Sequence, residues 1–204
     1  MLPEYKQWVE EDSALMTDPP DENLMSLFQQ GNEQAYALLV QRYKDELTNF
    51  AQRFLGDWDE AEDVVQETFV RVWRNRDSYT SASRFSTWVY TIASNLAKTR
   101  LRRWSLRRFV RLGGSQSDGP VFDLPDESAR PDGAADDTIR EERIQQALKS
   151  LPVKFREVII LRDIQQLSYE EIVAITGNAM GTVKSRINRG RAMLRDQLRD
   201  LIRD

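Results

Sequence analysis

Residues 167–194 read LSYEEIVAITGNAMGTVKSRINRGRAML. Ser168 and Glu171 form a capping-box pattern, which starts a helix because each side chain bonds the other residue's backbone N–H. Gly177 suits the left-handed conformation that follows a helix. The stretch therefore predicts a helix, a tight turn and a second helix, which is a helix-turn-helix. The second helix buries apolar residues spaced three and four apart, namely Met180, Val183, Ile187, Gly190 and Leu194.

The other face of this second helix is polar and basic. Lysine and arginine can donate to guanine in the major groove, and asparagine can bond adenine. An ordinary helical hairpin with a solvated face is the alternative, but capping, turn and basic face together favour DNA binding. The candidate DNA-binding residues are Thr182, Lys184, Ser185, Asn188, Arg189 and Arg191.

Charge divides the chain into four blocks. The net charge is −4, but it sums to −6 over 1–25, +4 over 26–112, −6 over 113–139 and +4 over 140–204. The third block is also rich in Gly, Pro, Ser and Asp, as flexible linkers are. We therefore predict a loose acidic N-terminal segment (1–22), a first domain (23–112), a flexible acidic linker (113–139) and a helix-turn-helix domain (140–204).

The first domain is expected to be a small helical bundle. Apolar residues recur at helical spacing over 35–54, 61–73 and 88–96, without convincing strand alternation. Gly56 ends the first of these helices. Because the second domain also reads as helices, the predicted fold class is all-α, with two small helical domains.

The chain contains no cysteine and no histidine. Disulfides, thiol nucleophiles and zinc fingers are thereby excluded, and acid–base catalysis loses its usual residue. No run approaches the ~18 to 20 apolar residues that span a bilayer, and no signal peptide is recognisable. We therefore expect a cytoplasmic protein without membrane insertion, metal or cofactor.

The second predicted helix of the first domain carries a line of acids. Asp59, Asp63 and Glu67 follow one another at four-residue spacing, with Glu62 and Gln66 beside them. Clustered carboxylates can bind metals in helical bundles, but those sites also use histidine. From the residues alone, a solvated acidic face is the simpler interpretation.

The third predicted helix becomes strongly basic after Leu96. Its cations have no acid among them, and the aromatic side chains of Trp104 and Phe109 lie between them, which favours phosphate binding. The loop 76–85 that precedes this helix could hold unstacked bases against its rings, or could be an ordinary connection with rings in the core. The cations are Lys98, Arg100, Arg102, Arg103, Arg107, Arg108 and Arg111.

These segments, in this order and spacing, resemble the extracytoplasmic-function (ECF) sigma factors of bacterial RNA polymerase, group IV of the sigma-70 family. Residues 63–69 (DVVQETF) are similar to the family's D-x-x-Q-E segment, and 85–95 (FSTWVYTIASN) to its F-x-T-W-L-x-x-I-A-x-N. Residues 167–172 and 181–186 resemble L-S-Y-x-E-I and G-T-V-K/R-S-R.

The resemblance implies a function and a set of roles. The protein would bind core RNA polymerase, direct it to promoters and assist promoter opening, while the polymerase performs the chemistry, so the chain is not expected to be an enzyme. Asp63, Gln66 and Glu67 would dock on the β′ clamp helices, and the second domain on the β flap and the minus-thirty-five element. The first domain would bind the melted minus-ten element, with Asn95 in the pocket for an extruded base. Its implied contacts are Tyr79, Arg84, Phe85, Asn95, Lys98, Arg102 and Arg103. An anti-sigma factor is a further implied partner.

Four departures and two alternatives remain. Gln166 stands where the family commonly has glycine, and Val173 where it commonly has alanine. Asn188 stands where some members carry an aromatic residue, and Gly190 where alanine is usual. Gly190 is expected to weaken its helix by roughly 1 kcal/mol relative to alanine. A stand-alone helix-turn-helix regulator would need a dimer and a symmetric site, and leaves the first domain unexplained. A carboxylate-based metal or hydrolytic enzyme is remote because histidine and a Gly-rich phosphate loop are lacking.

Overall fold

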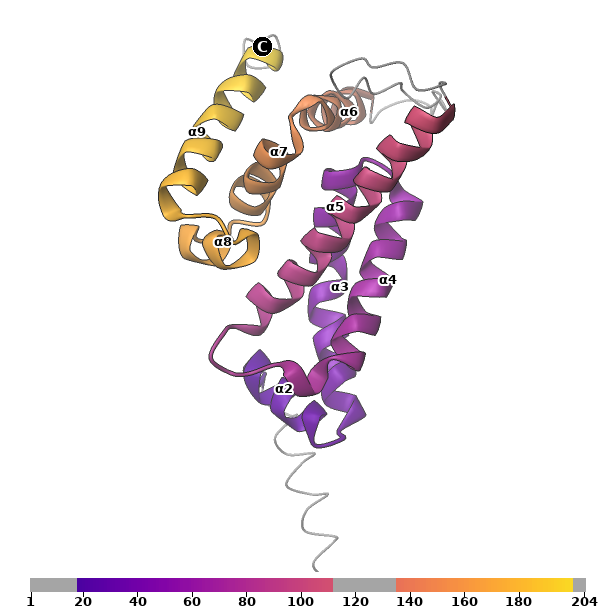
Figure 1. Ribbon diagram of the computed structural model, residues 1–204, viewed down its shortest axis with the longest axis vertical. Coiled ribbons are helices and arrows are strands. Elements are labelled where there is room, and N and C mark those ends of the chain that lie inside the picture. The colour runs from indigo at the N-terminus through magenta and orange to yellow at the C-terminus, as the bar shows by residue number, and fades with distance from the viewer. Residues whose placement is uncertain (1–17, 112–134, 200–204) are drawn as a thin grey trace, which may run out of the picture.

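The structure is a computed structural model that describes residues 18–111 and 135–199, with side chains over 18–107 and 138–199. Within these ranges every regular element is a helix, which confirms the predicted all-α class (Figure 1). The remaining parts of the predicted N-terminal segment and linker, 1–17 and 112–134, lie outside the described residues, as does 200–204.

Four helices form the first group: α2 (Asp21–Gln29), α3 (Glu33–Leu55), α4 (Trp58–Arg74) and α5 (Phe85–Arg111). The three longer ones pack side by side, as Figure 1 shows. Asn32 caps α3 through the backbone N–H of Ala35, and Asp57 caps α4 through that of Glu60. Gly56 has φ 71°, so the predicted glycine stop between α3 and α4 is confirmed.

Helix α2 was not predicted, and residues 18–22 differ from the loose N-terminal segment that was expected. Residues 18–22, expected to be loose, are held in place because Arg42 pairs with both Asp18 and Asp21. Helix α2 then buries Leu24, Met25 and Phe28. Pro20 followed by two acids and this apolar spacing was the available signal for a helix start.

The second group contains the predicted helix-turn-helix. The capping box is present in full, because the Ser168 hydroxyl accepts from Glu171 N and the Glu171 carboxylate accepts from Ser168 N. Gly177 is left-handed at φ 67°, as predicted. Ala179 occupies the N-cap position of the last helix, without a side-chain bond to the helix. The helices are α6 (Ala135–Ser150), α7 (Val153–Ile159), the π-helical turn η2 (Ile160–Ile164), α8 (Tyr169–Thr176) and α9 (Met180–Gln197).

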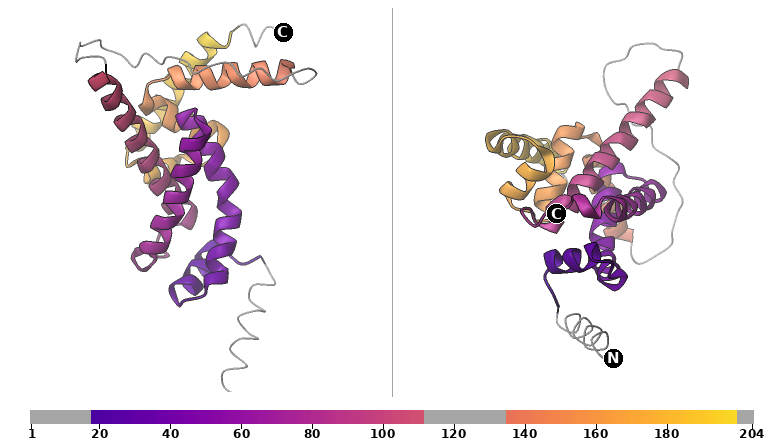
Figure 2. Two further views of the ribbon diagram at one scale, coloured as in Figure 1. Left: turned by 90° about the vertical axis from the view of Figure 1, so that its right-hand side faces the viewer. Right: turned by 60° about the horizontal axis from the view of Figure 1, so that its bottom comes forward.

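The two groups of helices share one hydrophobic core. Helix α8 packs on α5, while α6 and η2 pack on α3. In the left view of Figure 2, α6 lies across one end of the first group of helices. The buried hydrophobic side chains form one cluster, whose members range from Leu24 in α2 to Ile187 in α9. Helix α6 begins at Ala135, before the predicted boundary at 140. Gln166 has φ 57°, a left-handed conformation that costs a non-glycine residue roughly 1 to 2 kcal/mol, which explains why glycine fits this position.

Gly190 allows close helix packing, which opposes the gain in helix propensity that alanine would bring at this position. A Cβ at Gly190 would lie 2.7 Å from Cγ1 of Ile159, a buried side chain of α7 that cannot readily move. We expect Gly190→Ala to lower the free energy of unfolding by ~1 kcal/mol, because overpacking outweighs the gain in helix propensity. Urea unfolding measures this effect.

Gly181→Ala is the matched control for this prediction. It lies in the same helix, and a Cβ there would meet nothing within 4 Å. This control should raise stability by up to ~1 kcal/mol. A Gly190→Ala protein as stable as the wild type would contradict the packing argument.

Candidate protein and nucleic-acid interfaces

The predicted acidic face is present on α4. The side chain of Asp63 is 58 % exposed, Gln66 is exposed, and Glu67 lies at the same surface. Arginines face these acids, since Arg100 of α5 lies 3.3 Å from Asp63 Oδ2 and Arg71 lies 2.9 Å from Glu67 Oε1. The acids therefore belong to a charged surface that is open to a protein partner.

A polar groove runs between α4 and α5 beside these acids. Arg100 lines this groove and also pairs with Glu60 at 2.8 Å, and the indole N–H of Trp104 donates to the same carboxylate. Among the described side chains, no group of three or more acids is placed to hold a metal ion. The residues that line the groove are Asp63, Gln66, Glu67, Val70, Arg71, Leu96, Thr99, Arg100 and Arg103.

Two of the predicted minus-ten contacts are buried. Phe85 is 0 % exposed and Tyr79 is 6 % exposed. Their rings pack with each other and with Trp88 at centroid distances of 5.2 to 6.2 Å. In this arrangement both rings are covered by other side chains, and direct contact with a base stays a prediction. Both side chains lie buried beneath the loop between α4 and α5.

The remaining predicted minus-ten residues lie at the surface of that loop and of α5. Asn95, Arg102 and Arg103 are exposed. Arg84 is 75 % exposed, yet it reaches Glu171 of the second group at 3.2 Å. The ammonium of Lys98 lies 3.0 Å from Glu157 of α7. Two of the candidate DNA-binding cations are thus paired with acids of the second group.

Glu157 is the centre of this contact between the two groups of helices. Its carboxylate is only 5 % exposed and accepts from the Ser94 hydroxyl as well as from Lys98. Nearby, the Tyr90 hydroxyl donates to Gln165 at 2.8 Å. Glu157 was not among the predicted site residues, although an acid next to the apolar run Val158–Leu161 was a visible signal. Helices α7 and α8 therefore cover part of the face of α5 that was expected to bind DNA.

Helix α9 presents most of its predicted residues to solvent. Lys184, Ser185, Asn188 and Arg189 are exposed, whereas Thr182 is half-buried. Arg191 is different, because its guanidinium makes two bonds to the Asp163 carboxylate in η2. The exposed row matches the donor set for base edges in a major groove. Arg191 instead holds α9 against η2.

The capping box makes the stability of the N-terminus of α8 sensitive to acid. Burial raises the pKa of Glu171, but bonds from the Ser168 backbone and hydroxyl, together with Arg84, outweigh burial and hold the pKa below its ordinary value. A depressed carboxyl pKa stabilises the fold above the unfolded value of about 4.3, and this contribution is lost as pH falls through the folded pKa.

We expect Glu171→Gln to reduce the acid sensitivity of the fold. Glutamine keeps the capping geometry but cannot be protonated and has no charge for Arg84. Thermal unfolding between pH 3 and 7 should show a smaller loss of stability on acidification than in the wild type. Glu170→Gln, at the exposed neighbouring position, should leave the wild-type pH profile unchanged. Equal profiles for all three proteins would contradict the role of Glu171.

Comparison with known proteins identifies both groups of helices. The family model Sigma-70 region 2 matches residues 39–107, and Sigma-70, region 4 matches residues 141–194. The ECF RNA polymerase sigma factor SigW of Bacillus subtilis is 39 % identical over 173 residues, which cover 84 % of this chain and 92 % of the relative. The chain belongs to the ECF sigma-factor family.

Further ECF sigma factors agree over most of the chain. The sigma-E factor of Escherichia coli is 34 % identical over 193 residues, covering 90 % of this chain and 96 % of the relative. CnrH, solved in complex with the cytosolic domain of CnrY, has TM-score 0.66 and 27 % identity and covers 88 % of this chain and 97 % of its own. RpoE of Bartonella quintana, solved with the anti-sigma factor NepR, has TM-score 0.62 and 29 % identity, covering 80 % and 96 %.

This ECF sigma factor directs RNA polymerase to specific promoters and so starts transcription. The stand-alone helix-turn-helix regulator is not favoured, because the first group of helices matches sigma region 2. The family consists of sigma factors rather than enzymes in the usual sense. In the part of the chain that the structure describes, no helix is both long and apolar enough to cross a membrane.

Proposed function

We propose that three surfaces of this sigma factor have separate binding roles in transcription initiation. The acids Asp63, Gln66 and Glu67 of α4 bind the β′ clamp helices of core polymerase. Helix α9 enters the major groove of the minus-thirty-five element, with the second group of helices held on the β flap. The face of α5 around Asn95 and the loop before it bind the non-template strand of the melted minus-ten element. The observation that carries the proposal is the exposed row Lys184, Ser185, Asn188 and Arg189 on a helix held by a fully formed capped turn.

The arrangement of the two groups implies a conformational step. The two promoter elements lie about 25 base pairs apart, which is roughly 85 Å of duplex at 3.4 Å per base pair. Lys98 and Arg84 of the first group touch Glu157 and Glu171 of the second at 3.0 and 3.2 Å. The groups therefore separate when both elements are bound, and separation frees Lys98 and Arg84 for phosphate.

We further propose an anti-sigma factor as the partner of the closed arrangement. CnrH is bound to the cytosolic domain of CnrY, and RpoE to the anti-sigma factor NepR, and both share this fold. A partner that binds the two groups while they are together opposes the separation that promoter binding requires. Since core polymerase and promoter DNA are also its partners, we place the protein in the cytoplasm, in the nucleoid when in holoenzyme and at the membrane when a membrane anti-sigma factor holds it.

Run-off transcription tests the proposed function. Core polymerase is given fragmented genomic DNA of the source organism, with and without this protein. Discrete new start sites that share two short upstream motifs are the expected result, and they also supply the promoter sequence. An absence of new starts, from core polymerase that is active with another sigma factor, would contradict the proposal.

Arg189→Ala should weaken promoter-specific binding of the holoenzyme by ~1 to 3 kcal/mol, because a bidentate contact to guanine is lost. Competition between promoter and random DNA measures the specific part of the loss. Arg195→Ala, farther along the same exposed face of α9, is the control and should have a smaller effect. An equal loss on random DNA would show that Arg189 contacts only phosphate.

A further inference from the structure

Helix α2 contacts both ends of the loop between α4 and α5. This loop, residues 75–84, begins with a single 3-10 turn, η1 (Arg76–Ser78), and ends where α5 starts. Helix α2 lies before residues 39–107, the part that matches sigma region 2. Its contacts with the loop therefore add an element to the minus-ten surface that the matched region does not contain.

Gln29, in the last turn of α2, holds the beginning of the loop. Its side-chain amide donates to the carbonyl oxygen of Arg76 at 2.7 Å and to that of Tyr79 at 3.0 Å. Both donors of one amide nitrogen are thus used, and only a side chain with two donors at this position can make both bonds. The neighbouring Gln30 points elsewhere and is exposed, with its amide near Ser26 at 3.4 Å.

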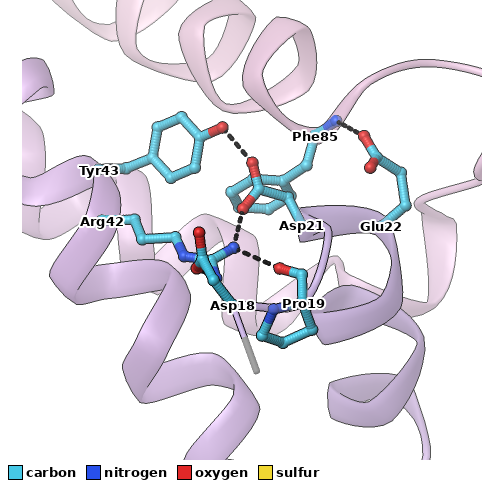
Figure 3. Close-up of polar contacts among 7 residues, drawn as sticks. All are labelled: Asp18, Pro19, Asp21, Glu22, Arg42, Tyr43 and Phe85. Carbon is cyan, nitrogen blue, oxygen red and sulfur yellow. Dashed lines mark hydrogen bonds and ion pairs between the residues drawn. The ribbon is translucent and has the colours of Figure 1, made fainter. Parts of the chain in front are cut away.

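Glu22, in the first turn of α2, holds the end of the loop. Its carboxylate accepts from the backbone N–H of Phe85 at 3.2 Å, which is one of the unpaired donors at the start of α5 (Figure 3). Asp21 beside it bonds Arg42 and Tyr43 of α3, so the first turn of α2 is itself fixed (Figure 3). Burial and the nearby carboxylates of Glu22 and Asp21 raise the pKa of Tyr79 to about 12.

Between these two anchors the loop closes on itself. The Tyr79 hydroxyl donates to the carbonyl oxygen of Ser83 at 2.8 Å, and the Tyr79 ring packs on Trp88. Residues 80–84 remain exposed at the tip. A tip on fixed ends loses less conformational freedom when it binds a ligand than a free loop does.

We propose that α2 is a positioning element for minus-ten recognition, in which Gln29 and Glu22 set the shape of the loop that meets the melted strand. Neither residue touches DNA; both act through the loop backbone. This inference rests on the proposed function, because it takes the loop and α5 as the surface that binds the non-template strand.

The experiment uses the full-length protein with core polymerase. The probe is a fluorescent single-stranded oligonucleotide with the non-template minus-ten sequence recovered by run-off mapping, compared with the same strand carrying one substituted base. Gln29→Glu keeps the size of the side chain but presents two acceptors to two carbonyl oxygens. Gln30→Glu makes the same chemical change one position along, where no loop contact is lost.

We expect Gln29→Glu to reduce the preference for the minus-ten strand over its substituted form by about tenfold, in line with the loss of two hydrogen bonds and new repulsion. Gln30→Glu should keep the wild-type preference, and both proteins should bind core polymerase as the wild type does. If Gln29→Glu does not fold, Gln29→Met removes the donors without adding charge and is expected to lower the preference in the same direction.

Each of the other outcomes contradicts either the positioning role of α2 or the assignment of the minus-ten surface. A wild-type preference in Gln29→Glu or Gln29→Met overturns the positioning role and leaves the proposed function intact. Equal losses on both strands, or a loss of core affinity, show a merely structural role and also overturn it. A wild-type holoenzyme without any preference between the strands overturns the assignment of the minus-ten surface itself.

Discussion

Asp63→Arg combined with Glu67→Arg should reduce the affinity of this sigma factor for core polymerase by at least ~100-fold, because like charges at a protein interface cost several kcal/mol. Asp63 is exposed and Glu67 is partly exposed on α4, and their ion pairs with Arg100 and Arg71 lie at the surface, so the fold does not depend on them. Fluorescence titration with labelled core polymerase measures the loss, and circular dichroism should show unchanged helix content.

The control for this experiment makes the same change in charge elsewhere on the first group of helices. Glu33→Arg with Asp45→Arg alters two exposed acids of α3 that lie outside the proposed interface. This protein should bind core polymerase nearly as the wild type does. An unchanged affinity in the Asp63 and Glu67 variant would remove α4 from the polymerase interface, while a similar loss in the control would point to net charge alone.

Features that depend on neighbouring residues in the chain could be predicted from sequence. The capping box of Ser168 and Glu171 and the left-handed Gly177 and Gly56 were expected and are present. Each requires only a few adjacent residues, and so the local pattern determines the outcome. The apolar spacing of α3, α4 and α9 was readable for the same reason.

Features that depend on contacts between distant segments could not be predicted. Tyr79 and Phe85 are aromatic residues in a polar segment, a pattern that fits base stacking as well as burial. In the structure both are buried, because Trp88 and α2 pack around them. Gly190 was expected to weaken its helix, because the sequence does not reveal that Ile159 of α7 packs closely against this position. Glu157 and its partners Ser94 and Lys98 lie in different groups of helices, and no local pattern connects them.

Arg156→Met should lower the free energy of unfolding by ~3 to 5 kcal/mol, the largest effect on stability that we expect. Arg156 is 0 % exposed. Its guanidinium donates to Phe54 O at 2.8 Å, to Leu151 O at 3.1 Å and to Lys149 O. Burial lowers its pKa to about 10, so it stays charged at pH 7. Methionine fills much of the space but leaves these buried carbonyls without their donor.

The position of these carbonyls explains why one side chain matters so much. Phe54 lies in the last turn of α3, and Lys149 and Leu151 lie at the end of α6, where helix carbonyls have no partner within the helix. A positive charge is also favourable at both ends because of the helix dipole. Arg156 thus caps one helix from each group, and its loss should weaken the closed arrangement together with the fold.

Two further substitutions separate the contributions of charge and geometry at Arg156. Arg156→Lys keeps the charge but lacks the fork that reaches both helix ends, and it should fall between Arg156→Met and the wild type. Lys154→Met, at an exposed position of the same helix, should change stability by less than ~0.5 kcal/mol. Urea unfolding measures all three. A loss below ~1 kcal/mol in Arg156→Met would mean that water or a shifted side chain replaces the guanidinium at both helix ends.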